Sequence, residues 1–333
     1  MQALVIPEKN HPIELQTRAD LQPAANEVIV KIYAAALNHR DVWIQKGQYA
    51  GLKYPIIPGS DGSGLVVSAG SSENQHWINR EVIIDPSMNW GDNIGFQDQK
   101  IYKILGLPDD GTFAGYVRVP ATNLVAKPMH LSFEEAASLP IAGVTAYRAL
   151  FTRAQLRPGE KVLITGIGGG VALTALQFAI AAGAIVYVSS GSAEKLEKAI
   201  ELGAKGGVNY TAGNWAQSLQ ELAGSFDIII DSAGGDGMGA LLGLAKPGGR
   251  LVFYGATRGN PTTLDLRKVF WKQLNLLGST MGSPEDFAAM IAFVNKHAIR
   301  PVVDRVFPID QGESALRHMD AAQQFGKIVI KII

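Results

Sequence analysis

The segment 162–172 constrains the fold of this chain more than any other part of the sequence. It reads Val-Leu-Ile-Thr-Gly-Ile-Gly-Gly-Gly-Val-Ala, so a β-branched strand enters a glycine-rich turn and an apolar helix leaves it. Glycines permit the tight turn and let backbone amides approach a pyrophosphate at the positive end of the helix. In this strand–turn–helix context we predict dinucleotide binding, with a purely structural turn as the alternative. The residues expected at this site are Gly166, Gly168, Gly169, Gly170 and Val171.

Apolar strands alternate with helices around this turn, which indicates an α/β fold with a doubly wound parallel sheet of the Rossmann type. Residues 1–126 instead contain short β-branched runs between turn residues, and the alternation at 326–332 indicates a strand that returns to this β-rich part. We therefore predict a nucleotide-binding domain at 127–282, inserted into a discontinuous domain at 1–126 and 283–333. The expected strands of the nucleotide-binding domain are 161–165, 185–189, 207–210, 227–231, 250–254 and 274–278.

Composition excludes several classes of function. Thirty basic residues balance thirty acidic ones, so no basic excess indicates a nucleic-acid or membrane partner. No apolar run approaches the roughly 20 residues of a membrane helix, and the N-terminus does not resemble a signal peptide, so we expect a cytoplasmic protein. The chain has no cysteine, and its six histidines form no pair at helical spacing, so we expect no metal site.

The end of the second strand of this domain distinguishes the two nicotinamide dinucleotides. A site for NAD(H) usually ends this strand with an acid that bonds the ribose 2′-hydroxyl. Here the strand ends without a carboxylate, and the hydroxyls and the ammonium at this strand end suit a 2′-phosphate. Glu194 belongs instead to the first turn of the next helix, where an acidic side chain interacts favourably with the helix dipole. We predict NADP(H), with a solvated helix lysine as the alternative for Lys195. The binding residues expected are Ser189, Ser190, Ser192 and Lys195.

Several collinear motifs resemble the medium-chain dehydrogenase/reductase superfamily, with a catalytic domain of the GroES-like type. The stretches 34–41, 139–150 and 325–327 match, as does Gly203-Ala204 followed by Val208-Asn209-Tyr210. The similarity is greatest to the zinc-lacking branch, which contains quinone oxidoreductases and alcohol-dehydrogenase-like proteins. This resemblance, together with the rule that ligands lie at the carboxyl ends of parallel strands, implies further cofactor contacts at Asn38, Thr145, Tyr210, Ser232, Ala233, Gly255, Ala256, Thr257, Met281, Gly282, Gly326 and Lys327.

The resemblance also implies that the zinc ligands are absent. Zinc-dependent members have a cysteine where this chain has Asn38, a His-Glu pair at Ser60-Asp61 and another cysteine at Ile141. The loop of a four-cysteine structural zinc site, near 85–112, is also without ligands. Without a Lewis acid, an acceptor whose negative charge delocalises is favoured, so the resemblance indicates reduction of a quinone, an enal or an enone.

Two residues are candidates for catalysis. By resemblance, Asn38 lies near the nicotinamide and the substrate oxygen, and Tyr49 orients a carbonyl or relays a proton. A structural cap for Asn38 and an ordinary half-buried position for Tyr49 are the alternatives, and we expect structural roles for His39 and Asp41.

Two other functions are compatible with the sequence: a metal-free alcohol or carbonyl oxidoreductase, and a nucleotide-binding or structural protein without turnover. The resemblance further implies a homodimer that extends the nucleotide-domain sheets edge to edge, through 250–254 and 274–278.

Overall fold

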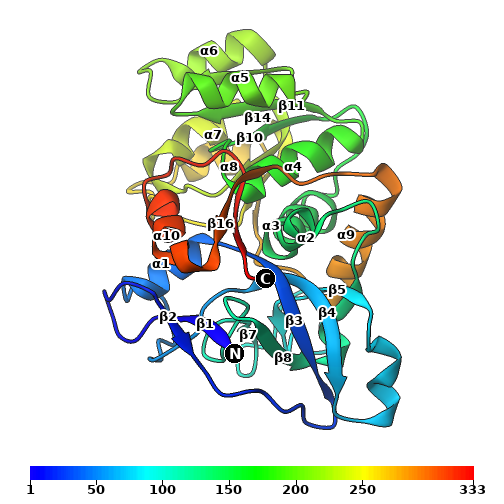
Figure 1. Cartoon of the computed structure of the whole chain (residues 1–333). Helices are drawn as coiled ribbons and strands as arrows, with labels where there is room; N and C mark the ends of the chain where they lie inside the picture. Colours follow the sequence, from blue (N-terminus) through cyan, green and yellow to red (C-terminus); the bar gives the residue numbers. More distant parts are fainter. The chain divides into compact units, whose positions relative to one another are not determined.

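A computed structural model describes residues 1–333 as two compact units (Figure 1). One unit comprises Met1–Ala142 and Ser283–Ile333, and the other comprises Gly143–Gly282. The sequence places 127–142 in the nucleotide-binding domain, whereas in the structure these residues belong to the first unit. The reason is packing: Ala137 joins Ala34, Ala36 and Val329 in a buried cluster of that unit.

The second unit contains a parallel sheet of six strands in the order β12-β11-β10-β13-β14-β15. This is the doubly wound order of a Rossmann fold, and it confirms the predicted fold class. The order reverses between β10 and β13, where a crevice for a ligand is expected. The strands are β10 (Lys161–Ile164), β11 (Ile185–Ser190), β12 (Gly206–Asn209), β13 (Phe226–Asp231), β14 (Ala245–Phe253) and β15 (Asn275–Gly278).

Helices flank this sheet (Figure 1). Side chains of α6 and α7 bury Leu163, Ile229 and Leu251 on one face in a single cluster. The α-helix Pro140–Tyr147 continues as a π-helical turn, Arg148–Arg153. The helices are α3 (Pro140–Tyr147), α4 (Gly170–Ala181), α5 (Ala193–Glu201), α6 (Trp215–Ala223), α7 (Met238–Leu244) and α8 (Leu266–Trp271).

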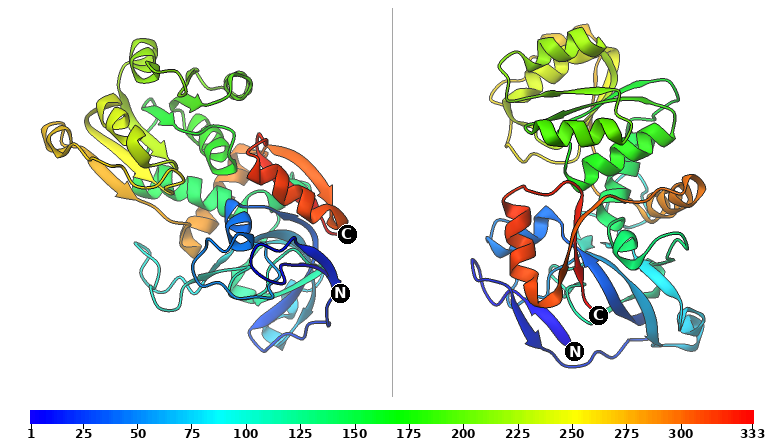
Figure 2. Two further views of the ribbon diagram at one scale, coloured as in Figure 1. Left: turned by 90° about the vertical axis from the view of Figure 1, so that its left-hand side faces the viewer. Right: turned by 45° about the horizontal axis from the view of Figure 1, so that its top comes forward.

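The first unit contains a seven-stranded, mostly antiparallel sheet in the order β16-β17-β3-β4-β5-β9, with β8 paired to β3. The C-terminal strand β17 pairs with β3, as predicted for a strand that returns to the β-rich part; the red and blue strands of Figure 2 show this. Two further strand pairs, β1–β2 and β6–β7, stand apart. The strands are β1 (Gln2–Val5), β2 (Glu14–Thr17), β3 (Glu27–Ala36), β4 (Asp61–Ala69), β5 (Glu81–Ile84), β6 (Ser87–Met88), β7 (Lys103–Ile104), β8 (Tyr116–Pro120), β9 (Leu124–Ala126), β16 (Val303–Pro308) and β17 (Lys327–Lys331).

Local capping determines where two helices of this unit begin. Ser132 accepts the N–H of Glu135, and the Glu135 carboxylate accepts the N–H of Ser132, so the two residues form a capping box. Ser283 and Asp286 form the same reciprocal pair at the start of α9. The helices are α1 (His39–Gln45), α2 (Phe133–Ala137), α9 (Pro284–His297) and α10 (Gly312–Asp320). Over the whole chain, no helix combines the length and the hydropathy needed to span a membrane.

Candidate functional site

The glycine turn joins β10 to α4 as the sequence predicts. Gly166 and Gly168 have φ values of +66° and +119°, which side chains rarely adopt, so glycine is required at both positions. The N–H of Ile167 donates to the carbonyl of Ser189 at 2.9 Å and holds the turn against β11. The first amides of α4 have no intrahelical acceptor, so they are available to an anion at the positive end of the helix.

The residues after β11 lie beside this turn, but their hydroxyls are not equivalent. The buried Ser190 hydroxyl donates to the carbonyl of Ile167 at 3.3 Å, and the Ser192 hydroxyl accepts the N–H of Lys195 as the N-cap of α5. Glu194 pairs with Lys198 at 2.6 Å along the helix, and this hydrogen bond keeps the pKa of Glu194 below its usual value.

Lys195 lies over the glycine turn. A Cβ atom placed on Gly168 would lie 2.7 Å from its Cδ and 3.4 Å from its Nζ. The ammonium is therefore close to the place where the turn would hold a phosphate group. Binding of a phosphate by Lys195 stays a prediction, with a solvated helix lysine as the alternative.

A contact that the sequence did not predict lies at the same end of the sheet. The Arg258 guanidinium stacks over the Tyr210 ring, 5.0 Å from its centroid. Tyr210 itself lies against Gly191, since a Cβ atom there would be 3.0 Å from the tyrosine oxygen. Arg258 therefore adds a second cation beside the end of β11. Its position directly after the predicted cleft loop 255–257 was the signal that could have identified it.

The loops after β13 and β14 are joined through their backbones. The N–H groups of Thr257 and Arg258 donate to the carbonyls of Ser232 and Ala233 at 3.2 and 2.8 Å. Asp231 connects β13 to β10, because its two carboxylate oxygens accept the Thr165 hydroxyl and the Gly234 N–H. Two loops and one helix carry the remaining residues predicted for this unit. The loop after β14 contains Gly255 and Ala256, the loop after β15 contains Met281 and Gly282, and α3 contains the buried Thr145.

In the first unit, strand register brings three distant polar residues together. Ala36 at the end of β3 pairs with Asp61 of β4 on one side and with Val329 of β17 on the other. Residues just beyond the end of β3 therefore meet the start of both neighbouring strands. This explains why Asn38, Asp61 and Lys327 form one cluster.

This cluster is tightly hydrogen-bonded. The Lys327 ammonium donates to the Leu37 carbonyl at 2.7 Å, to Asn38 Oδ1 at 2.7 Å and to Asp61 Oδ2 at 2.9 Å. Asn38 Nδ2 donates to Asp61 Oδ2 at 3.0 Å, and the N–H of Ile141 donates to Asp61 Oδ1 at 2.9 Å. Asp61 is completely buried and Lys327 nearly so, at 4% exposure. Lys327 was predicted to contact the cofactor, but here its three ammonium hydrogens all have acceptors within the unit.

A second set of polar contacts surrounds the cluster. The buried Arg40 donates to the Ser60 hydroxyl and to the Leu105 carbonyl, and its guanidinium lies 5.0 Å from the centre of the Tyr49 ring. The Tyr49 ring also stacks with Trp43, and the residue is half-buried. Its catalytic role stays a prediction beside the structural alternative.

Asp41 has the structural role that the sequence predicts. Its carboxylate accepts the N–H groups of Asn38 at 2.8 Å and Gly59 at 3.3 Å. Burial raises the pKa of Asp41 to about 6, although the neighbouring Arg40 opposes the shift. Gly326 precedes β17 with a φ of +122°, and the Val302 carbonyl leaves no room for a side chain there.

Comparison with known proteins identifies both units. Residues 24–129 match the family described as the alcohol dehydrogenase GroES-like domain, and residues 170–296 match the zinc-binding dehydrogenase family. A zinc-type alcohol dehydrogenase-like protein of Leptosphaeria maculans is 36% identical over 97% of this chain and 95% of its own length. One from Schizosaccharomyces pombe is 37% identical over 96% and 94%. A solved NAD-dependent alcohol dehydrogenase aligns over 100% of both chains with a TM-score of 0.92 and 35% identity.

More distant relatives carry other names. An NADP-dependent alcohol dehydrogenase of Mycolicibacterium smegmatis is 29% identical over 85% of this chain and 84% of its own. A quinone oxidoreductase-like protein of Bos taurus is 27% identical over 96% of this chain and 88% of its own. The names of these relatives therefore include both cofactors and more than one type of reaction.

Proposed function

The chain belongs to the medium-chain dehydrogenase/reductase superfamily and is an oxidoreductase, and from this premise we propose a zinc-independent, NADP(H)-dependent reductase of quinones or α,β-unsaturated carbonyls. The observation that carries the proposal is the Asn38–Asp61–Lys327 cluster. Two of its members, Asn38 and Asp61, stand at positions where the resemblance to zinc-dependent members would place a cysteine and the glutamate of a His-Glu pair, and Lys327 bonds both.

These side chains do not fit a zinc ion. Asn38, Ser60 and Ile141 offer an amide, a hydroxyl and a hydrocarbon, whereas zinc sites use thiolate, imidazole and carboxylate. The one carboxylate, that of Asp61, already bonds an ammonium, and the Ser60 hydroxyl is held by the Arg40 guanidinium. No group of three or more His, Cys, Asp or Glu side chains in the chain could hold a metal ion. No step of the reaction is therefore assigned to a metal.

The second unit fits NADP(H). The glycine turn and the first amides of α4 would hold the pyrophosphate, and Lys195 would bind the 2′-phosphate beside the end of β11. Arg258 adds positive charge at the same place, and no carboxylate stands at Ser189 or Ser190 to repel the phosphate. The name of the Mycolicibacterium smegmatis relative is consistent with this choice. The name of one solved relative describes it as NAD-dependent. NADH must therefore be compared with NADPH in every assay.

When bound, NADPH supplies a hydride, and the acceptor also takes up one proton, which gives a hydroquinone or a saturated carbonyl compound. The protein must stabilise negative charge that develops on the acceptor oxygen. Asn38 is the donor for this oxygen, because its amide has one N–H not used by Asp61. Tyr49, whose ring contacts Arg40 and Trp43, orients the acceptor or passes it a proton.

Oxidation of NADPH, followed by absorbance with a quinone, an enal and a plain aldehyde, tests the proposal. We expect turnover with the quinone or the enal, and equal rates with a chelator and with added Zn²⁺. Activity that requires Zn²⁺ would contradict the metal-free mechanism. Tight NADPH binding without turnover of any acceptor would instead support a protein without catalytic function.

A metal-free alcohol or carbonyl oxidoreductase is the second candidate, favoured by the names of the 35–37% identical relatives. It predicts NADP⁺ reduction by simple alcohols at a rate comparable to quinone reduction. Measuring both directions with one enzyme preparation separates the two candidates.

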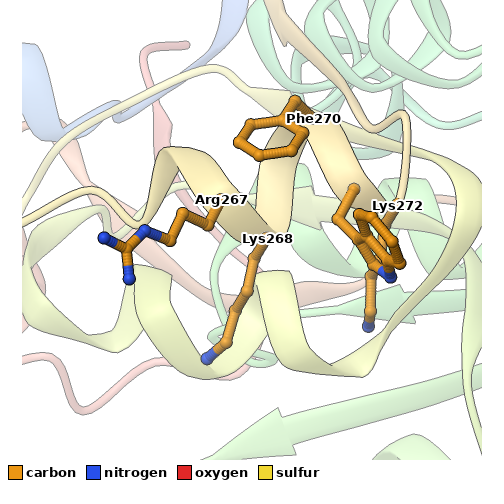
Figure 3. Close-up of a pocket in the computed structure, with 5 residues that line it drawn as sticks. Arg267, Lys268, Phe270 and Lys272 are labelled. Atoms are coloured by element: carbon orange, nitrogen blue, oxygen red, sulfur yellow. The ribbon is translucent and has the colours of Figure 1, made fainter.

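We also propose a homodimer that forms through the edge of the nucleotide-domain sheet. Of the two strands predicted for this contact, β14 is paired on both sides, so only β15 offers a free edge. Helix α8 lies just before β15 and leaves Phe270 and Trp271 exposed by 65% and 82%. Figure 3 shows the surface hollow around Phe270 with its lysine and arginine neighbours. Trp271→Glu should convert a dimer to a monomer in light scattering, whereas a wild-type monomer would refute the proposal.

A further inference from the structure

The Lys327 ammonium bonds Asn38 and Asp61, which stand where the resemblance would place a cysteine and the glutamate of a His-Glu pair, and all its acceptors belong to its own unit. An ammonium has three hydrogens and no lone pair, and the three acceptors at 2.7–2.9 Å use all of them. No hydrogen is left for a cofactor phosphate or a substrate. A direct contact between Lys327 and a ligand would require the loss of one of these buried bonds.

The contacts of Lys327 determine the orientation of the Asn38 amide. A lysine can only donate, so the Asn38 atom that faces it must be the oxygen. A carboxylate can only accept, so the atom that faces Asp61 must be the nitrogen. One amide hydrogen is thereby committed to Asp61. The other has no acceptor within the chain, and Asn38 is only partly buried.

From this geometry we infer that Lys327 is a positioning residue that fixes and polarises Asn38 as the hydrogen-bond donor to the acceptor oxygen. The positive charge at the amide oxygen draws electron density from the nitrogen, which makes the free N–H a stronger donor, since hydrogen bonds in a chain strengthen one another. Asp61 balances the charge and holds the other hydrogen. Lys327 is thus an organic cation that acts on the substrate through one amide, where zinc-dependent relatives would use a metal.

This inference rests on the proposed function, because it assumes that Asn38 contacts the acceptor. The test begins with Lys327→Met, which keeps the length of the side chain and removes its charge. This variant leaves the buried Asp61 without its cation, so the protein can fail to fold. The double variant Lys327→Met/Asp61→Asn removes both charges and retains a hydrogen-bond partner for Asn38. Lys331→Met, the same change at the exposed end of β17, is the matched control.

We expect the double variant to lower kcat for quinone or enal reduction about 10- to 100-fold, with the dissociation constant of NADPH changed by less than about twofold. Lys331→Met should change neither. The decisive comparison adds Asn38→Ala. In the Asn38→Ala background, the Lys327→Met/Asp61→Asn pair should have almost no further effect on kcat, because a positioning residue acts through the group that it positions.

The outcomes distinguish the inference from the proposed function. Weaker NADPH binding with unchanged kcat would overturn the inference and make Lys327 a cofactor ligand. The inference would also be overturned if the Lys327→Met/Asp61→Asn pair lowered kcat by the same factor with and without Asn38→Ala. If Asn38→Ala lowers kcat about 100-fold and the double variant Lys327→Met/Asp61→Asn does not lower it, the proposed function stands and only the inference fails. If the wild-type protein reduces no acceptor, or Asn38→Ala has no effect, both fail.

Discussion

Replacing Lys195 by alanine tests how this chain distinguishes the two nicotinamide dinucleotides. The lysine lies over Gly168 and beside the residues that follow β11, so its ammonium is within reach of a phosphate bound at this edge. NADPH and NADH differ only in the 2′-phosphate. A lysine that binds this phosphate should therefore affect NADPH alone.

The expected loss can be estimated from one charge-assisted hydrogen bond. Such a bond contributes about 1.5–3 kcal/mol, which corresponds to an increase of about 10- to 100-fold in the Kd of NADPH. NADH binding should change by less than about twofold. Because Lys195 is half-buried, salt screens the interaction in part, so the difference between the variant and the wild type should decrease at high ionic strength.

Fluorescence titration of both dinucleotides gives the two dissociation constants without turnover. Lys205→Ala is the matched control, since this exposed lysine precedes β12 at the amino end of the strands, away from the predicted site. Equal losses for NADPH and NADH would refute the reasoning, because they would assign Lys195 to the shared pyrophosphate. No loss for either would make it a solvated helix lysine.

Three other substitutions test the site and the fold. Ser190→Asp should shift the preference toward NADH in the same titration, because a carboxylate repels the 2′-phosphate and bonds a ribose hydroxyl, whereas Ser190→Asn should not. Burial raises the pKa of Asp85 from 3.8 to about 7, so the folded chain keeps a proton that the unfolded chain releases. The free energy of unfolding should therefore fall by at most about 4 kcal/mol as pH rises from about 4 to 7. In urea titrations at pH 5 and pH 8, the Asp85→Asn variant should not show this fall. Gly326→Ala should destabilise the fold by about 2 kcal/mol or more in such titrations, because its φ is +122° and the new Cβ would meet the Val302 carbonyl at 2.4 Å. The control Gly213→Ala should not destabilise the fold, because the space around Gly213 is open.

Local patterns predicted the nucleotide-binding unit well. All six of its strands overlap the ranges predicted for them, and the glycine turn determines its own geometry through two positive φ angles. Three α-helices, α1, α8 and α10, were not predicted. Helix α8 presents Phe270 and Trp271 to the surface, so its apolar residues do not mark a buried face. Helix α10 is short and is held by distant partners, such as the bond from Gln45 to Glu313.

The cluster in the first unit shows what a single sequence cannot supply. Lys327 and Asp61 are separated by 266 positions, and no neighbouring residue indicates that this lysine points inward. Only the pairing of β17 and β4 with β3 brings the two charges together. The resemblance identified the positions without metal ligands, but the contacts among Asn38, Asp61 and Lys327 depend on strand register. For the same reason, Arg258 was not predicted as the partner of Tyr210.

An ammonium and a zinc ion differ in how they can act on a substrate oxygen. Zinc with an open coordination position bonds the oxygen directly and stabilises a localised alkoxide. Lys327 has no free hydrogen, so in the proposed site the acceptor oxygen would meet one amide N–H of Asn38 and a positive charge behind it. One polarised N–H suffices where conjugation spreads the charge and falls short where the charge stays on one oxygen. The rates should therefore decrease from quinone to enal to plain aldehyde, and Asn38→Ala should slow the enal more than the quinone. A plain aldehyde reduced as fast as a quinone would show that another group stabilises the alkoxide.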